Sequence, residues 1–161
     1  MNTLIFILIV VLAFVFMEFM AWFSHKYIMH GFLWVLHKDH HIRDGRKMEW
    51  NDVFALIFGL PSILMILAGA EYNLPWVLAA GIGIALYGLG YFLFHDIYVH
   101  HRIRMLTGFD NRYLRATRRA HEDHHQPHQH RNYGFLLAPW QYYRRSEERR
   151  VGKECRLRWS P

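Results

Sequence analysis

The sequence predicts an all-α integral membrane protein with about three to four transmembrane helices and a histidine-rich metal site on the cytoplasmic side. The chain of 161 residues is 53% hydrophobic, yet its formal net charge is +6. Its apolar residues form runs long enough to cross a bilayer, and its basic residues avoid those runs. Thirteen histidines are present, most of them in clusters. This pattern indicates membrane lipids as partners and no nucleic acid, because long uncharged apolar runs are not typical of nucleic-acid binders.

The first apolar run extends from Thr3 to Phe23 and is interrupted only by Glu18. A signal peptide is the competing interpretation, but the run has no basic segment before it and no small-residue cleavage site after it. We therefore expect a retained transmembrane helix. An ionisable residue so deep in a span is costly. Glu18 is expected either to face inward, as a partner of the histidines, or to lie at the level of the lipid headgroups.

Two further runs, 53–70 and 75–94, are separated by a short loop that contains Asn73. A short polar loop between two runs of spanning length predicts a tight helical hairpin. The third run is rich in glycine, which allows neighbouring helices to approach closely.

The distribution of charge predicts the topology. All nineteen Lys and Arg residues lie either in the segment 26–47 or after His101. Under the positive-inside rule both segments are cytoplasmic, with the N-terminus and the 71–74 loop on the other side. Every histidine then lies on the cytoplasmic face.

The C-terminal part of the chain changes character twice. After Phe94 it is basic and aromatic, which is typical of a segment beside anionic headgroups. From about Ser146 the chain has no apolar period, so we expect one domain, 1–145, followed by a non-native or disordered tail, 146–161. The tail contains the single cysteine, Cys155. Disulfides and cysteine-ligated metal sites are therefore excluded.

The histidines form an internal repeat. In each half a predicted transmembrane helix leads into H-x4-H and later into H-x-D-H-H, with spacers of six and twenty residues between the two motifs. The ten patterned positions are the candidate metal ligands: His25, His30, His37, His40 and His41 in the first half, and His95, His100, His121, His124 and His125 in the second. His101, His128 and His130 lie outside the pattern.

The spacing bears on how these histidines share metal ions. Three- and four-residue spacings place imidazoles on one side of a helix, so each H-x-x-H-H motif can present several of them inward. Five residues advance a regular helix by about 140° and about 7.5 Å. The H-x4-H pairs must therefore either reach different metals or straddle a helix distortion. Ten histidines exceed the three protein ligands of a catalytic zinc, so two metals are expected. Imidazole alone leaves iron, zinc, copper and nickel open.

Acidic residues adjoin three of the motifs. Asp39, Asp96 and Asp123 are expected either to orient ligand imidazoles or to serve as helix caps and solvated groups.

Two alternative functions share these residues. His121, Glu122 and His125 match H-E-x-x-H, the zinc motif of a metalloprotease in which the glutamate activates water. The first copy has Lys38 where the second has Glu122, which argues against a catalytic glutamate. The other alternative is a metal-binding or transport protein without enzymatic activity.

The chain resembles the membrane-bound, histidine-rich di-iron hydroxylases related to fatty acid hydroxylases and sterol desaturases, and within them the bacterial β-carotene 3-hydroxylases. The resemblance covers about Met17 to Tyr143. The stretches that carry it are Trp22–Gly31, Leu36–His41, Phe94–Asp96 and Gly108–Arg115 leading to His121. It implies that the ten patterned histidines bind iron, with His101 as a rival to His100, and that no catalytic residue is needed beyond the metal ligands.

The resemblance also implies an activity. It is the O2-dependent hydroxylation of C3 of the β-ionone ring of β-carotene, giving β-cryptoxanthin and zeaxanthin, with ketocarotenoids on the way to astaxanthin as further substrates. The cofactors would be two non-haem iron ions, with O2 as co-substrate and electrons from a ferredoxin-type donor or reductase chain. The location would be the bacterial inner membrane. An apolar tunnel from the bilayer, with Phe32, Trp34, Tyr91 and Phe92 as candidate lining residues, would admit the carotenoid. A sterol or fatty-acid hydroxylase is the alternative with the same motifs.

Overall fold

The fold was analysed in a computed structural model, which describes residues 1–42, 48–103, 111–126 and 132–144. All regular elements in these ranges are helical. In order they are α1 (Thr3–Phe23), η1 (Ser24–Phe32), α2 (Trp34–His41), η2 (Trp50–Asp52), α3 (Val53–Glu71), α4 (Pro75–Tyr91), η3 (Phe92–Val99) and α5 (Arg112–His124). The tail 146–161 lies outside the described residues, so its expected origin stays a prediction.

Among the described residues three helices are long and apolar enough to span a membrane: Thr3–Phe32, Trp50–Glu71 and Pro75–Val99. The three predicted spans and the hairpin are confirmed. Pro75 opens α4 at its first turn, where a missing backbone N–H costs nothing. The exposed apolar side chains on all three helices are the surface that a bilayer would cover.

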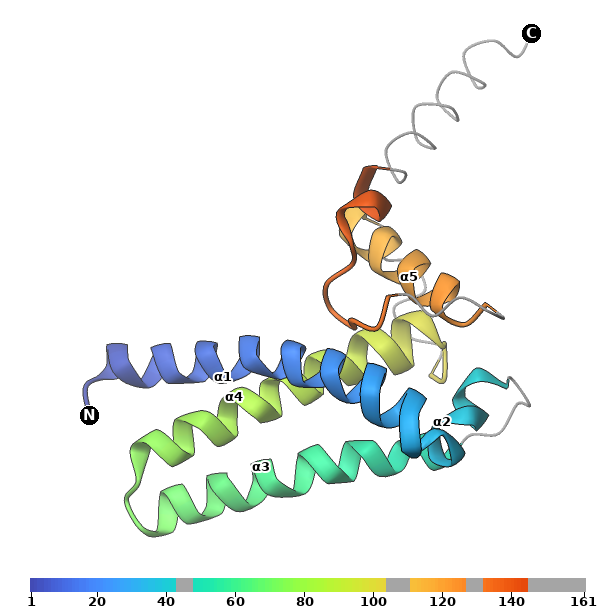
Figure 1. Cartoon of the computed structure of the whole chain (residues 1–161). Helices are drawn as coiled ribbons and strands as arrows, with labels where there is room; N and C mark the ends of the chain where they lie inside the picture. The colour runs from blue at the N-terminus through green and yellow to red at the C-terminus, as the bar shows by residue number, and fades with distance from the viewer. Residues whose placement is uncertain (43–47, 104–110, 127–131, 145–161) are drawn as a thin grey trace, which may run out of the picture.

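The three spans pack with α4 in the middle, against both α1 and α3 (Figure 1). Close approach depends on glycine. A Cβ on Gly83 would come within 2.5 Å of the Val10 carbonyl oxygen in α1, and a Cβ on Gly69 within 2.5 Å of the Leu78 nitrogen. The buried hydroxyl of Ser62 adds a hydrogen bond of 2.9 Å to the carbonyl oxygen of Gly81, which joins α3 to α4.

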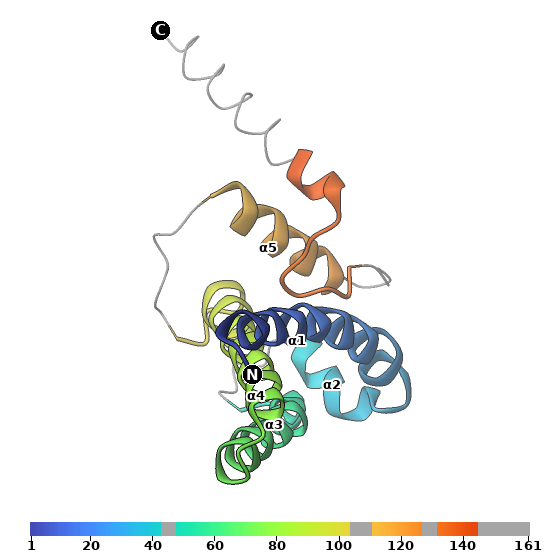
Figure 2. The ribbon, with the colours of Figure 1, turned by 90° about the vertical axis from the view of Figure 1, so that its left-hand side faces the viewer.

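Both histidine-bearing spans end in a π-helix. α1 continues into η1, and α4 continues into η3. At Gly31 the backbone leaves helical geometry (φ −100°, ψ −124°), so the chain turns out of η1 and starts α2 at one end of the bundle (Figure 1). In both views α3 and α5 lie on opposite sides of the pair formed by α1 and α4 (Figure 2).

Glu18 fixes the C-terminal segment 132–144 to the bundle. Its carboxylate accepts hydrogen bonds from the backbone N–H groups of Phe135, Leu136 and Leu137 and from the Tyr87 hydroxyl. The inward orientation expected for Glu18 is therefore confirmed, but its described hydrogen bonds go to this segment and to Tyr87 rather than to a histidine.

The same segment holds α5 in place. The Tyr113 hydroxyl donates to the Leu136 carbonyl oxygen at 2.7 Å, and the Tyr142 hydroxyl donates to Asp123 at 2.7 Å. At its N-terminus α5 is capped by Asn111, whose side chain accepts from the Leu114 N–H. These contacts bring the histidines at the end of α5 against those on η1 and α2.

Candidate metal centre

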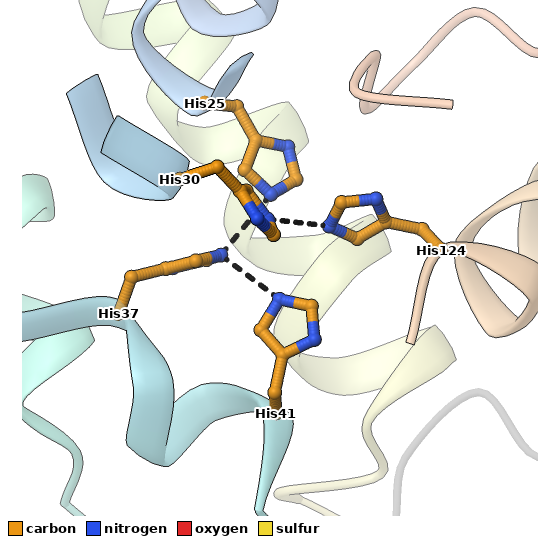
Figure 3. Close-up of side chains that lie close together, drawn as sticks. All are labelled: His25, His30, His37, His41 and His124. Carbon is orange, nitrogen blue, oxygen red and sulfur yellow. Dashed lines mark hydrogen bonds between the residues drawn. The ribbon is translucent and has the colours of Figure 1, made fainter. Parts of the chain in front are cut away.

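The structure gathers the patterned histidines into two adjacent groups. The first cluster consists of His25, His30, His37, His41 and His124 (Figure 3). The second cluster consists of His40, His95, His100 and His121. Within each cluster one nitrogen from every imidazole lies within 4.8 Å of the others. Nine of the ten predicted residues are therefore brought together as two potential metal sites.

The tenth residue, His125, adjoins the second cluster. Its Nε2 lies 2.8 Å from Nε2 of His121. In the other half of the chain, Nε2 of His41 lies 3.2 Å from Nε2 of His37. His125 is thus placed relative to His121 as His41 is relative to His37.

The π-helices explain the H-x4-H motifs. In a π-helix the backbone hydrogen bonds link residues five apart, so residues at that spacing share a face. The His100 N–H donates to the His95 carbonyl oxygen at 3.0 Å, which is a bond of this kind. His25 and His30 consequently enter the first cluster together, and His95 and His100 enter the second. Of the two interpretations left open by the sequence, the helix distortion is confirmed, and both members of each pair lie in one cluster.

The H-x-x-H-H motifs are divided between the clusters. His37 and His41 point into the first cluster, whereas His40 points into the second. In the later copy the corresponding middle histidine, His124, crosses in the opposite direction and joins the first cluster (Figure 3). His121 remains in the second cluster. Each cluster therefore consists of histidines from one half of the chain plus one histidine from the other half.

In His25 and His37 the outer nitrogen, Nδ1, bonds to a supporting group, and the inner nitrogen, Nε2, faces the cluster. The partners of the outer nitrogens indicate that the inner ones carry a free lone pair. Nδ1 of His37 donates to Asn51 Oδ1 at 2.7 Å, and Nδ1 of His25 donates to the Tyr133 carbonyl oxygen at 3.0 Å. A neutral imidazole whose Nδ1 carries the proton presents an unprotonated Nε2. This is the arrangement of metal-bound histidines, which almost always donate their other N–H to an oxygen acceptor.

Two buried nitrogens reinforce the fit to a metal. Nε2 of His40 and Nε2 of His95 are buried without a hydrogen-bond partner. Their Nδ1 atoms are occupied by Glu49 at 2.8 Å and Asp96 at 3.2 Å, respectively. A buried polar atom without a partner is costly, and coordination to a metal ion would satisfy both nitrogens. The donor set therefore fits bound metal ions.

Five of the patterned histidines lie outside the membrane spans, and burial keeps them in the neutral, metal-binding form. Loss of hydration lowers the pKa of His37 to about 4, although the hydrogen bond to Asn51 raises it in part. Burial and neighbouring imidazoles lower the pKa of His41 to about 3 and that of His125 to about 2. The pKa values of His40 and His121 are lowered for the same reasons. All five imidazoles are thus unprotonated at neutral pH.

The acids expected to orient imidazoles are only partly the ones that do so. Asp96 contacts His95, as expected. Asp39 instead accepts from the Trp50 N–H at 2.6 Å, and Asp123 accepts from Tyr142. The residues that orient His40, His37 and His25 are Glu49, Asn51 and the Tyr133 carbonyl. Sequence reasoning missed these because they lie outside the motifs, and η2 brings Glu49 and Asn51 back to α2.

Glu122 does not face the histidines. Its carboxylate pairs with Arg118, one turn earlier on α5, at 2.8 Å, and its side chain is 42% exposed. The H-E-x-x-H interpretation therefore lacks its general base. His101 is exposed, with a positive φ of 53°, whereas His100 lies in the second cluster. His100 is thus the residue placed among the histidines, and His128 and His130 lie outside the described residues.

An apolar cavity of about 370 Å³ is lined in part by residues that contact the clusters. It lies among α1, α3 and α4, and its lining includes Asn51, Tyr91, Asp96 and Phe135. Tyr91 stacks on His95 with ring centroids 4.5 Å apart, and Phe135 stacks on His25 at 4.7 Å. Of the expected tunnel residues Tyr91 and Phe92 line this cavity; Phe32 and Trp34 do not.

Comparison with known proteins places this arrangement among membrane hydroxylases. Residues 10–145 match the family described as Fatty acid hydroxylase. The chain is 38% identical to the beta-carotene hydroxylase of Pantoea ananas, over 82% of this chain and 77% of that protein. It is 40% identical to the beta-carotene hydroxylase of Pseudescherichia vulneris, over 73% of this chain and 66% of that protein.

A plant relative is longer than this chain. The chloroplastic beta-carotene hydroxylase 2 of Capsicum annuum is 36% identical over 76% of this chain but only 41% of its own length. No solved structure matches the chain.

Proposed function

Because the chain belongs to the fatty acid hydroxylase family, we propose that it hydroxylates C3 of the β-ionone ring of β-carotene, yielding β-cryptoxanthin and zeaxanthin. Ketocarotenoids on the way to astaxanthin are proposed as further substrates. The observation that carries the proposal is the pair of buried, all-histidine clusters side by side at the end of three apolar helices. The proposed substrate follows from the named activity of the bacterial relatives.

The proposed cofactors are two non-haem iron ions, one in each cluster, held by the ten patterned histidines. Bound iron supplies the activation of O2, with electrons from a ferredoxin-type donor. The protein's own part is to hold neutral imidazoles in place through the acceptors on their outer nitrogens and to keep water from the site by burial. His25, His37, His95 and His124 are among the largest fully buried side chains in the described residues, which supports this division of roles.

The cavity among α1, α3 and α4 is the proposed position of the substrate ring. Its walls are apolar side chains such as Met17, Phe54 and Ile84, which suit a hydrocarbon that dissolves only in the bilayer. The ring end of the carotenoid would lie against Tyr91 and Phe135, the two aromatic residues that stack on histidines of the second and first clusters. Only the ring carbons nearest these residues would then approach the metals, which would restrict hydroxylation to one position.

The proposed location is the bacterial inner membrane, with the clusters on the cytoplasmic side. The support is the charge distribution in the sequence, because every Lys and Arg residue lies in the segment 26–47 or after His101 and none lies in the 71–74 loop. This orientation would give a soluble ferredoxin-type donor access to the site.

Expression in cells that accumulate β-carotene tests the proposal. Pigment analysis should show β-cryptoxanthin and then zeaxanthin, and the products should disappear when iron is withheld. A chain that is present in the membrane and loaded with iron but yields no zeaxanthin would contradict the substrate assignment. Hydroxylated sterols or fatty acids in the same cells would then favour the sibling activity.

A further inference from the structure

Two histidines in each cluster have a described acceptor on Nδ1, and the charge of these acceptors differs between the clusters. In the first cluster they are neutral: the Tyr133 carbonyl oxygen for His25 and the Asn51 amide oxygen for His37. In the second cluster they are carboxylates: Glu49 for His40 and Asp96 for His95. His25 and His95 occupy equivalent positions of the internal repeat, so this difference is not a consequence of their place in the motif.

Arg102 organises the carboxylates of the second cluster. The guanidinium of Arg102 lies 2.6 Å from Glu49 Oε2, 2.6 Å from Asp52 Oδ1 and 3.6 Å from Asp96 Oδ1. Its backbone N–H donates to the Asp96 carbonyl oxygen at 2.9 Å, in the turn that follows η3. The side chain of Arg102 is only 20% exposed. Glu49 and Asp96 are thereby fixed in the positions from which they accept from the two imidazoles.

The charge of the acceptor changes the donor strength of the ligand. A carboxylate that accepts from Nδ1–H draws the proton towards itself and raises the basicity of Nε2 more than a neutral carbonyl does. Such charge-assisted hydrogen bonds are roughly twice as strong as neutral ones. The two Nε2 atoms without partners, on His40 and His95, belong to the imidazoles that have carboxylate acceptors.

We propose that the chain holds its two metal ions unequally. The second cluster binds the tighter ion, because Glu49 and Asp96, aligned by Arg102, increase the donor strength of His40 and His95. Glu49, Asp96 and Arg102 act as positioning residues, since they reach the metal only through the imidazoles. The inference rests on the proposed occupancy of both clusters and adds that the two sites are not equivalent.

Chelator competition on the purified full-length chain loaded with Zn²⁺, a redox-inert probe, tests the inference. We expect two steps of metal release, separated by about 10- to 100-fold in chelator concentration, the range by which such outer partners change metal affinity. In Glu49→Gln the tighter step should weaken by a similar factor, while the weaker step moves less than about twofold. His95→Ala should remove the tighter step and His25→Ala the weaker one.

The matched control is Glu122→Gln. Glu122 is also paired with an arginine, Arg118, at 2.8 Å, but it lies on the exposed face of α5. Both release steps should be unchanged in this variant. A single release step in the unmodified chain would overturn the inference, as would two steps that Glu49→Gln leaves in place or a tighter step that disappears with His25→Ala.

Mössbauer spectroscopy of the unmodified chain loaded anaerobically with ⁵⁷Fe(II) gives a test that needs no variant. With one equivalent of iron we expect mainly one doublet, and a second equivalent should add a second doublet. Two doublets that grow together from the first equivalent would overturn the inference. Failure of hydroxylation with two distinct metal sites intact would count against the proposed activity alone. A chain that binds no metal would remove the basis of both.

Discussion

The two halves of the chain carry the same histidine pattern but support it in different ways. Each half has a membrane helix that ends in a π-helix, followed by a short helix with an H-x-D-H-H motif. In the first half the short helix α2 follows at once and is held by η2. In the second half α5 comes later and is held by the segment 132–144. The repeat thus preserves the ligands, whereas the supporting contacts are specific to each half.

The two halves also differ at the residue that lies seven positions before the first histidine of each H-x4-H motif. Position 25 of the first half and position 95 of the second both carry histidine, but seven residues earlier the halves have Glu18 and Gly88. Glu18 holds the C-terminal segment, and Gly88 lines the cavity. One half therefore contributes the anchor for the segment that covers the site, and the other contributes space for the proposed substrate.

The largest expected effect comes from the histidines that cross between the halves. His40→Ala should reduce metal binding at the second cluster, and His124→Ala should reduce it at the first cluster. Each variant should lose hydroxylation by more than about 100-fold, beyond the 10- to 100-fold that loss of an outer partner costs. Pigment analysis and metal content measure the two effects. Loss of metal from the first cluster in His40→Ala, or from the second cluster in His124→Ala, would contradict this assignment of the two residues.

The anchor in the first half should have a large effect on stability. Glu18→Ala leaves three backbone N–H groups and the Tyr87 hydroxyl without their acceptor. The Leu137 N–H is exposed and can turn to solvent, whereas the other three groups are partly buried. Each unsatisfied buried group costs about 1–3 kcal/mol, so the free energy of unfolding should fall by about 3 kcal/mol. Thermal unfolding in detergent measures it. Glu71→Ala, at the exposed end of α3, is the control and should change stability by less than about 0.5 kcal/mol.

The contact between the equivalent spans should have a smaller effect. Gly83→Ala would place a methyl group 2.5 Å from the Val10 carbonyl oxygen and 2.7 Å from Ala13 Cβ, so α1 and α4 must separate. We expect a loss of about 1–3 kcal/mol, the usual cost of overpacking. Gly88→Ala meets no atom within 4 Å and should be neutral or slightly stabilising. Equal unfolding temperatures for the two variants would count against the packing described for α1 and α4.

The smallest effect should come from the position at which the two H-x-D-H-H motifs differ. Glu122→Gln removes an exposed ion pair with Arg118, and exposed pairs contribute about 0–1 kcal/mol. Hydroxylation and metal content should both remain within about twofold of the unmodified chain. A severe loss of activity would support the H-E-x-x-H interpretation and contradict the assignment of Glu122 as a surface residue without a catalytic role.

The sequence was sufficient to predict the parts of the structure that repeat. Apolar runs of spanning length gave the three membrane helices, and the duplicated spacing identified the histidines that the clusters contain. The expected enzyme class, an oxidoreductase of the hydroxylase type, is confirmed by the family and its relatives. Hydrophobic length and motif spacing are properties of the chain itself, so they can be read without knowledge of the fold.

The remaining features depend on tertiary contacts. The five-residue spacing suggested a distortion, but only the backbone hydrogen bonds of η1 and η3 show that each pair shares a cluster. The crossing of His40 and His124 depends on how α2 and α5 face each other across the bundle. Glu49 and Asn51 were missed because the return of η2 to α2, through the bond between Asp39 and the Trp50 N–H, is not visible in the motif.

The count of iron atoms bound to the purified chain tests the central claim most directly. Anaerobic loading with ferrous iron, removal of excess metal and elemental analysis should give two iron atoms per chain, falling to about one in His95→Ala or His25→Ala. A single metal ion per chain, unaffected by one of these substitutions, would contradict the account of two histidine clusters as two metal sites.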